Sequence, residues 1–172
     1  GSADETARIW LLADGSPVRT LKGHTGHVES VCVTPDGRRV VTGSKDNTAR
    51  VWLLADGAHV RTLEGHTSSV NSVCVTPDGL HVVTGSHDNL VKVWDFLSGK
   101  ELLTLRGHVE GVNCVAAAQN GNKPLVASGA YDCSVGVWDP VRGGGPLLVL
   151  MNPGPSSRPS RFLRARGRAN VY

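Results

Sequence analysis

The sequence predicts an all-β protein assembled from a repeated antiparallel unit of four short strands. Tryptophan recurs at intervals of 42, 42 and 44 residues, and a Gly-His pair recurs every 42 residues. More than half of the positions in two consecutive units are identical, so the period is a true internal repeat. Short β-branched runs alternate with turn sequences, and helical periodicity is absent. The markers are Trp10, Trp52, Trp94 and Trp138, and Gly23, Gly65 and Gly107.

The unit that begins at Gly23 shows how each strand is specified. Its first strand, "VESVCVT", is almost wholly apolar or small, which is typical of a strand buried on both faces. Pro-Asp-Gly, a tight Lys-Asp-Asn turn and Ala-Asp-Gly separate the following strands, because these residues favour bends. The last strand is the most polar and is expected at the outer edge. The predicted strands cover 28–34, 38–44, 48–54 and 59–65.

The spacing of these markers resembles that of the WD40 repeat family. Twenty-seven residues separate His24 from Trp52 and His66 from Trp94, and the third unit is two residues longer. The Trp-Asp pair that names the family stands at Trp94 and Trp138, whereas leucine follows the other two tryptophans. The resemblance implies a partial β-propeller of three four-stranded antiparallel WD40 blades plus an N-terminal half blade. The expected repeats are 1–22 (the C-terminal half of a repeat), 23–64, 65–106 and 107–151, the last with a divergent end.

Histidine, aspartate and a hydroxyl residue, threonine or serine, are the residue types of a hydrolytic triad and occur in every complete repeat. The resemblance implies instead that they form a hydrogen-bonded chain with the tryptophan inside each blade. A catalytic triad would need one exposed nucleophile beside an oxyanion hole, whereas this set recurs three times, so we expect a structural role and no enzyme activity. Thr42 and Ser44 both offer the second-strand hydroxyl, and Ser128 beside Ala130 favours the earlier position. The expected tetrads are His24, Thr42, Asp46 and Trp52; His66, Thr84, Asp88 and Trp94; and His108, Ser128, Asp132 and Trp138.

Residues that differ between near-identical repeats are the candidates for partner recognition, because loop tips on a rigid scaffold commonly carry binding. Two tip positions stand out, one just before the turn aspartate and one at the start of the first strand. In the family these positions lie on the top face of the propeller, where peptides dock. The candidates are His27, Glu29, Lys45, Ser69, Asn71, His87, Asn113 and Tyr131.

The spacing of cysteine and histidine predicts no metal site and no cofactor. None of the four cysteines forms a C-x-x-C pair, so small buried thiols are expected rather than zinc ligands or disulfides. The Gly-Gly-Gly run at 143–145 lacks the lysine and helix of a phosphate-binding loop and is expected to be a turn before a last strand over 146–150. The chain has no apolar run long enough to span a bilayer. We expect a cytoplasmic location, or a nuclear one.

The repeat pattern stops after Leu150, and 152–172 is rich in Arg, Pro and Ser. This composition predicts a disordered tail. Five arginines lie between 158 and 168 without an acidic residue, and such a segment can contact phosphates. Three and a half repeats do not close a propeller, so we expect remaining blades in cis or in trans and a larger regulatory protein. The predicted function is a non-catalytic scaffold for protein or peptide partners, and the alternative is a nucleic-acid-associated module that uses the arginine-rich tail.

Overall fold

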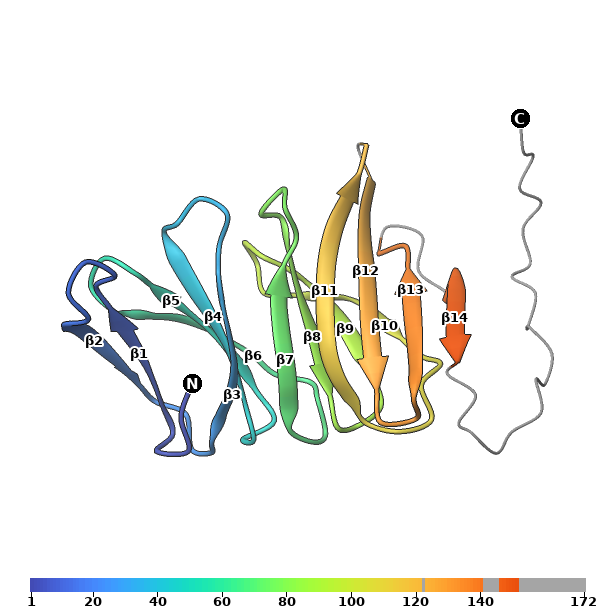
Figure 1. The fold of residues 1–172 in the computed structure, drawn as a ribbon, viewed down its shortest axis with the longest axis horizontal. Coiled ribbons are helices and arrows are strands. Elements are labelled where there is room, and N and C mark those ends of the chain that lie inside the picture. Colours follow the sequence, from blue (N-terminus) through green and yellow to red (C-terminus); the bar gives the residue numbers. More distant parts are fainter. Residues whose placement is uncertain (122, 141–145, 152–172) are drawn as a thin grey trace.

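The computed structural model describes residues 1–121, 123–140 and 146–151, and strands are its only regular elements (Figure 1). The described residues contain no helix that is long and apolar enough to span a membrane. The expectations for 143–145 and for the tail over 152–172 lie outside the described residues. The strands are β1 (Thr6–Trp10), β2 (Pro17–Lys22), β3 (Val28–Val33), β4 (Arg39–Ser44), β5 (Ala49–Leu53), β6 (His59–Leu63), β7 (Val70–Val75), β8 (His81–Ser86), β9 (Val91–Asp95), β10 (Glu101–Leu105), β11 (Val112–Asn120), β12 (Lys123–Ala130), β13 (Ser134–Trp138) and β14 (Leu148–Met151).

These strands form three four-stranded antiparallel sheets and one two-stranded sheet. We call β3–β6 the first sheet, β7–β10 the second sheet, β11–β14 the third sheet and β1–β2 the half-sheet. Neighbours in each sheet are consecutive in the chain, as in a meander. Figure 1 shows the four sheets standing side by side in chain order. The predicted fold, a partial propeller of three blades and a half blade, is confirmed.

In the first and second sheets, a threonine at the base of the hairpin fixes the turn between the first two strands. Thr34 Oγ1 donates to Asp36 Oδ1 and accepts from the backbone N–H of Arg39. Thr76 makes the same bonds around the Pro-Asp-Gly turn of the second repeat. The threonine therefore belongs to the turn, and β3 ends at Val33 rather than at 34 as predicted.

The apolar core lies between neighbouring sheets. Valines of the first strand of one sheet pack against the second and third strands of the sheet before it, as Val70 and Val73 do against Val41 and Val51. Close approach requires glycine, since a Cβ atom on Gly43 would lie 2.8 Å from Val70 Cγ1. Ser30 Oγ also accepts from the backbone N–H of Val73, so the innermost strands are joined directly.

The expectation that the first strand of the unit beginning at Gly23 is buried on both faces is wrong. In β3, Val31 is 48% exposed and Val33 is 55% exposed, whereas Val73 and Val75, at the same positions of β7, are 5% and 8% exposed. The first sheet, which lies beside β7, has four strands, whereas the half-sheet beside β3 has only β1 and β2. Burial of this strand therefore depends on the neighbouring sheet.

The thiols also differ from expectation. All four cysteines are free, but Cys114 and Cys133 are exposed and Cys32 and Cys74 only half-buried. Cys114 takes the place that Ser30 and Ser72 hold in the earlier repeats, on the side of the third sheet where no further sheet is described. Cys133 lies in the tight turn with φ 60°, a left-handed conformation that Asn47 and Asn89 adopt in the other repeats.

The third repeat holds its additional residues in the hairpin between β11 and β12. These strands span nine and eight residues, whereas their counterparts in the earlier repeats span six. Figure 1 shows the hairpin rising beyond the neighbouring sheets. The insertion therefore lengthens one hairpin: His108 and Ser128 are 20 residues apart, whereas His24 and Thr42 are 18 apart, yet the hydrogen bond between the two side chains is kept.

Candidate functional site

The structure brings the four tetrad side chains together in each complete repeat. In the first repeat, Trp52 Nε1 donates to Thr42 Oγ1 at 2.8 Å, and His24 Nε2 lies 2.7 Å from the same oxygen. His24 Nδ1 lies 2.7 Å from Asp46 Oδ2. One arrangement satisfies every group: the indole donates to the hydroxyl, the hydroxyl donates to His24 Nε2, and the Nδ1–H donates to the carboxylate. This arrangement needs a neutral imidazole.

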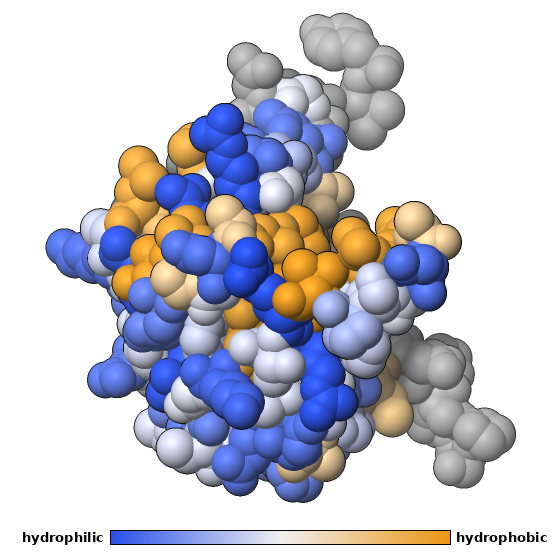
Figure 2. Space-filling model, turned by 90° about the vertical axis from the view of Figure 1, so that its left-hand side faces the viewer, coloured by the Kyte–Doolittle hydropathy of each residue, from blue (hydrophilic) through white to orange (hydrophobic). Residues whose placement is uncertain are grey.

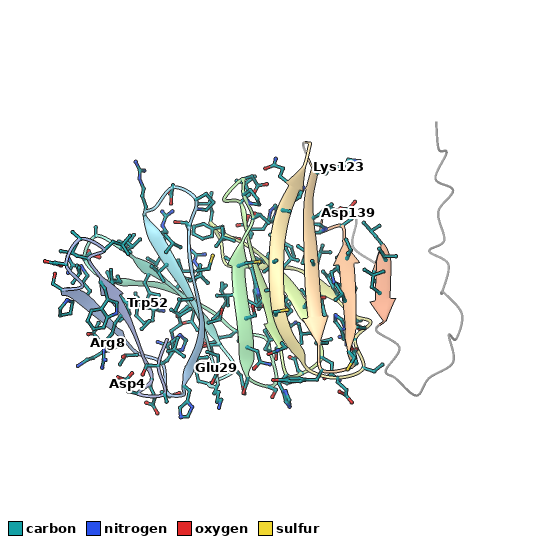
Figure 3. The ribbon with its side chains drawn as sticks, in the orientation of Figure 1. Asp4, Arg8, Glu29, Trp52, Lys123 and Asp139 are labelled. Atoms are coloured by element: carbon teal, nitrogen blue, oxygen red, sulfur yellow. The ribbon has the colours of Figure 1, made fainter. Side chains whose placement is uncertain are left out.

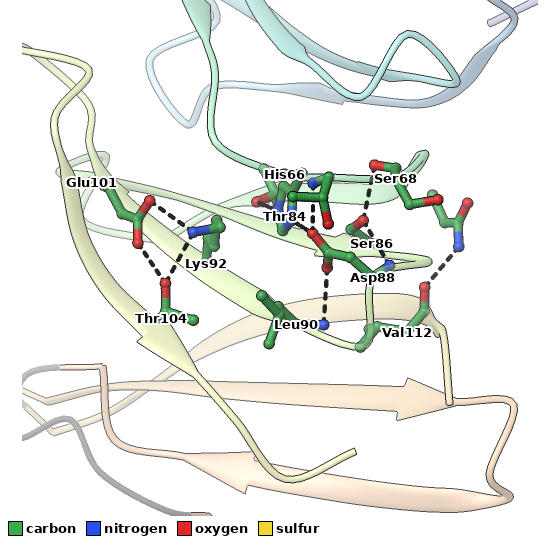
Figure 4. Close-up of polar contacts among 12 residues, drawn as sticks. His66, Ser68, Thr84, Ser86, Asp88, Leu90, Lys92, Glu101, Thr104 and Val112 are labelled. Carbon is green, nitrogen blue, oxygen red and sulfur yellow. Dashed lines mark hydrogen bonds and ion pairs between the residues drawn. The ribbon is translucent and has the colours of Figure 1, made fainter. Parts of the chain in front are cut away.

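The same geometry recurs in the second and third repeats. His66 Nε2 lies 2.7 Å from Thr84 Oγ1, which accepts from Trp94 Nε1 at 2.9 Å, and Figure 4 shows His66, Thr84 and Asp88 in one cluster. In the third repeat Ser128 Oγ replaces the threonine oxygen, at 2.7 Å from both its histidine and its tryptophan partner. The methyl group of threonine is therefore dispensable for the network, whereas the hydroxyl is common to all three.

Ser44, the alternative hydroxyl, has a different role. Its Oγ donates to the backbone oxygen of Gly26 and accepts from the backbone N–H of Asp46, so it holds the tight turn against the start of the first strand. Ser86 repeats both bonds in the second repeat. Ala130 at this position in the third repeat has no hydroxyl for either bond.

The electrostatics of the first tetrad favour a neutral histidine beside an ionised aspartate. Burial lowers the pKa of His24, although Asp46 partly opposes this effect. Burial of Asp46 opposes ionisation, but hydrogen bonds from Thr48 and His24 outweigh it and lower the pKa of Asp46 to about 2. Asp88 and Asp132 also have pKa values of about 2, because hydrogen bonds to each carboxylate outweigh the effect of burial.

These groups are arranged to stabilise the blade rather than to carry out a reaction. Thr42 and Thr84 are fully buried, so a substrate has no access to either hydroxyl. Each buried polar bond contributes about 1 kcal/mol net, and an unpaired partner would cost about 1–3 kcal/mol. The tetrad therefore ties the second strand, the third strand, the tight turn and the Gly-His segment of each blade together.

The predicted partner-binding residues lie along one edge of the array, which we call the variable edge; it comprises residues 27–29, 45, 69–71, 87, 111–113 and 131. Within each repeat the edge is held by one backbone bond of 2.9 Å, from Lys45 N to His27 O, from His87 N to Ser69 O and from Tyr131 N to Gly111 O. Figure 3 places Glu29 at the lower end of the strands and Lys123 at the opposite end. Lys45, His87 and Tyr131 are all exposed.

The residues of the variable edge differ in their exposure and in the contacts that their side chains make. Lys45 Nζ lies 3.4 Å from Glu29 Oε1, so the first repeat presents an ion pair. Asn71 is half-buried, and its Nδ2 donates to the backbone oxygen of Val112 in the next sheet, which gives Asn71 a structural contact. Asn113 is the equivalent of Asn71 and is exposed.

A hollow of about 330 Å³ lies on the variable edge between the second and third repeats. The rings of His87 and Tyr131 meet there edge to face, with their centroids 5.9 Å apart. Gly111 permits this approach, since a Cβ atom there would lie 2.6 Å from His87 Nδ1. Sequence reasoning identified both rings but missed Asn89, Val109 and Glu110, which also line the hollow. Glu110 differs from its counterparts Gly26 and Ser68, so a comparison of the repeats could have identified it.

No group of three or more His, Cys, Asp or Glu side chains within the described ranges is placed to hold a metal ion. His27, His81 and His87 lie on separate repeats or strands. The chemistry that the variable edge offers is therefore hydrogen bonding, aromatic contact and charge.

Comparison with known proteins agrees with this architecture. The family profile described as "WD domain, G-beta repeat" matches residues 15–52, 57–95 and 99–139, which together make up more than half of the chain. A curated relative, "Ribosome assembly protein 4" of Chaetomium thermophilum (strain DSM 1495 / CBS 144.50 / IMI 039719), is 58% identical over 38 residues. That match covers 22% of this chain and 7% of the relative, so the chain spans a small part of the curated protein it resembles. The recurring blades, their tetrads and the family profile together establish that the chain belongs to the WD40 repeat family.

Proposed function

We propose that the chain is a non-catalytic scaffold that binds a protein or peptide partner along its variable edge. WD40 repeats typically serve as interaction scaffolds. The observation that carries the proposal is that side chains which differ between otherwise matching repeats collect on one exposed edge and border a hollow there.

Peptide selection followed by edge substitution tests the proposal. Peptides are selected from a random displayed library on the full chain, and their affinities are measured by fluorescence anisotropy. The variant Lys45→Ala/His87→Ala/Tyr131→Ala should weaken the selected peptides by at least about tenfold, equivalent to about 1.4 kcal/mol. The control Arg38→Ala/Lys123→Ala alters the opposite edge and should leave the affinities unchanged. Equal loss in both variants, or no loss in either, would rule out the variable edge as the binding surface.

We also infer that further blades, in the same polypeptide or in another, cover the open side of the third sheet. Val135 is 42% exposed and Leu150 is 50% exposed, whereas their equivalents Val91 and Leu105 are almost fully buried against a following sheet. Association of the chain at rising concentration, abolished by Val135→Asp, would support completion in trans. A chain that stays monomeric at every concentration would exclude it. The larger protein would be a regulatory one of the cytoplasm or nucleus.

A nucleic-acid-associated role is a second proposal, and it rests on the five arginines of 152–172. Binding through these residues would weaken steeply as the salt concentration rises, because phosphate contacts release counterions. Measuring RNA and DNA binding with and without 152–172 distinguishes the two roles. Affinity that survives the deletion would contradict this second proposal and leave the scaffold proposal intact.

A further inference from the structure

The hollow between the second and third repeats has a lining that is fixed by hydrogen bonds. Asn89 Nδ2 donates to the backbone oxygen of Val109 at 3.1 Å, and the backbone N–H of Tyr131 donates to the oxygen of Gly111 at 2.9 Å. The edge-to-face contact between the rings of His87 and Tyr131 belongs to the same lining. A ligand that enters the hollow therefore meets a preformed surface, which lowers the entropic cost of binding.

The carboxylates at this hollow favour a cationic ligand. Glu110 is exposed, and within the described residues its carboxylate has no hydrogen-bond or ion-pair partner. Next to the lining, the buried Asp132 carboxylate accepts from the backbone N–H of Val109. Burial opposes the ionisation of Asp132, but hydrogen bonds outweigh it and lower the pKa of Asp132 to about 2. No lysine or arginine is among the described residues that line the hollow.

The equivalent place between the first and second repeats carries a different charge. Lys45 stands there at the position of His87, and Ser68 stands at the position of Glu110. The carboxylate on that part of the edge belongs to Glu29, and it is already paired with Lys45 Nζ at 3.4 Å. An unpaired carboxylate beside aromatic rings is therefore a property of the later junction, and the repeat pattern does not require it.

The aromatic surface at the hollow suits a planar cation. Figure 2 views the array from the half-sheet, and its lower part, on the side of the variable edge, is coloured mainly as hydrophilic. Within the hollow, by contrast, Val109 and Tyr131 are 76% and 54% exposed and offer apolar surface. A guanidinium group can stack on an aromatic ring and form paired hydrogen bonds with a carboxylate, whereas an ammonium group has no planar face.

We propose that the hollow is a subsite for an arginine side chain of the partner that binds the variable edge. The guanidinium group lies against the ring of Tyr131 and donates to the carboxylate of Glu110. The stem of the arginine packs on Val109. This proposal rests on the scaffold function and adds the chemistry of one side chain that the edge recognises.

Paired peptides test the subsite. Peptides with one central arginine between randomised flanks are screened on the full chain, and each peptide that binds is made again with citrulline, which keeps the shape of arginine without its charge. Fluorescence anisotropy measures the affinity of both members of each pair. We expect arginine to bind about fivefold more tightly than citrulline, because an exposed ion pair and an exposed cation–π contact each contribute modestly. Lysine at the centre should bind more weakly than arginine.

Substitution of Glu110 shows whether this residue is the source of the preference. Glu110→Gln should reduce the arginine-to-citrulline ratio to below about twofold. The control Glu29→Gln makes the same change of charge on the same edge, in the first repeat, and should leave the ratio unchanged. The urea midpoint of Glu110→Gln should match that of the original chain, because Glu110 is exposed. The charge reversal Glu110→Lys should make peptides with a central glutamate bind more tightly than those with arginine.

The outcomes separate this proposal from the scaffold proposal. A ratio near one in the original chain, or a ratio that survives Glu110→Gln, would overturn the arginine subsite. Lysine that binds as tightly as arginine would also overturn it, because the planar group would then contribute nothing. In each of these cases, peptides that still depend on Lys45, His87 and Tyr131 would leave the scaffold proposal intact. Absence of saturable binding by every peptide, from this library and from the random one, would refute both proposals.

Discussion

The hydroxyl of Thr84 should contribute several kilocalories per mole to the free energy of unfolding, through its bonds within the second sheet. Thr84 is fully buried, accepts from Trp94 Nε1 at 2.9 Å and lies 2.7 Å from His66 Nε2. Thr84→Val keeps the shape of the side chain but leaves both partners buried without a bond. Each unpaired group costs about 1–3 kcal/mol, so we expect a loss of about 3 kcal/mol in the free energy of unfolding. For a chain of this size the melting temperature should fall by roughly 6–12 °C.

Urea titration followed by tryptophan fluorescence and far-ultraviolet circular dichroism measures this loss. Two controls separate the hydroxyl from the methyl group and from β-branching. Thr84→Ser retains the hydroxyl, as Ser128 does in the third repeat, and should cost only about 1 kcal/mol for the lost methyl group. Thr67→Val changes an exposed threonine whose backbone N–H alone contacts Asp88, and it should stay within about 0.5 kcal/mol of the original chain.

A Thr84→Val variant as stable as Thr84→Ser would contradict this prediction, because loss of the hydroxyl would then destabilise the protein no more than loss of the methyl group. A double variant with His66→Ala adds a second check. If the two residues act in one network, the combined loss should be smaller than the sum of the single losses. Strict additivity would show that the two side chains act independently despite their short separation.

Three further predictions follow from the same geometry. The pKa values of about 2 for the tetrad aspartates lie below the usual range, so the stabilisation by these carboxylates is present above pH 4 and should be lost as the pH falls from about 4 to 2. Urea midpoints measured across this range should fall less steeply with pH in Asp88→Asn than in the original chain. An unchanged slope would show that Asp88 does not contribute to the pH dependence of stability. Gly43→Ala should lower the free energy of unfolding by about 1–3 kcal/mol, because the added methyl group pushes the first two sheets apart. Gly129→Ala should lower it less in the same urea assay, because the methyl group there meets only the thiol of the exposed Cys114. Equal losses in the two variants would show that close packing of the sheets at Gly43 is not important for stability. Val73→Ala should lower the free energy of unfolding by about 1.5 kcal/mol, whereas Val31→Ala, at an exposed position, should lower it by less than about 0.5 kcal/mol. Thermal melts measure both losses. A larger loss for Val31→Ala would show that the first sheet is covered in solution.

The strands could be predicted from the residues, and the tetrads from the resemblance to the WD40 family, because both depend on contacts that are local to one repeat. Each sheet pairs strands that follow one another in the chain, so turn residues and β-branched runs are enough to place them within one or two residues. The tetrad residues also recur at the same distances from Gly-His in the first two repeats, and two residues farther from it in the third. The threonine at the base of the Pro-Asp-Gly hairpin was assigned to the strand because its side-chain bonds to the turn are not visible in a hydropathy pattern.

The role of individual edge residues could be predicted only in part. Variation between repeats pointed to Lys45, His87 and Tyr131, and the structure gathers them on one exposed edge. The same criterion also selected Asn71, whose amide instead bonds the backbone of the next sheet. The contact joins residues 41 apart in the chain, so only the packing of adjacent sheets reveals it.

The sequence by itself determined the period and the four-stranded unit, and its resemblance to the WD40 family identified the polar residues that tie each blade together, because all of these features arise within about 40 residues of chain. Tertiary structure alone decided which surfaces are covered. The segments "SVCV" of β3 and β7 are identical, yet Val31 is half exposed and Val73 is buried. Burial of a blade face is a property of the neighbouring sheet, and two identical segments therefore carry no record of it in their own residues.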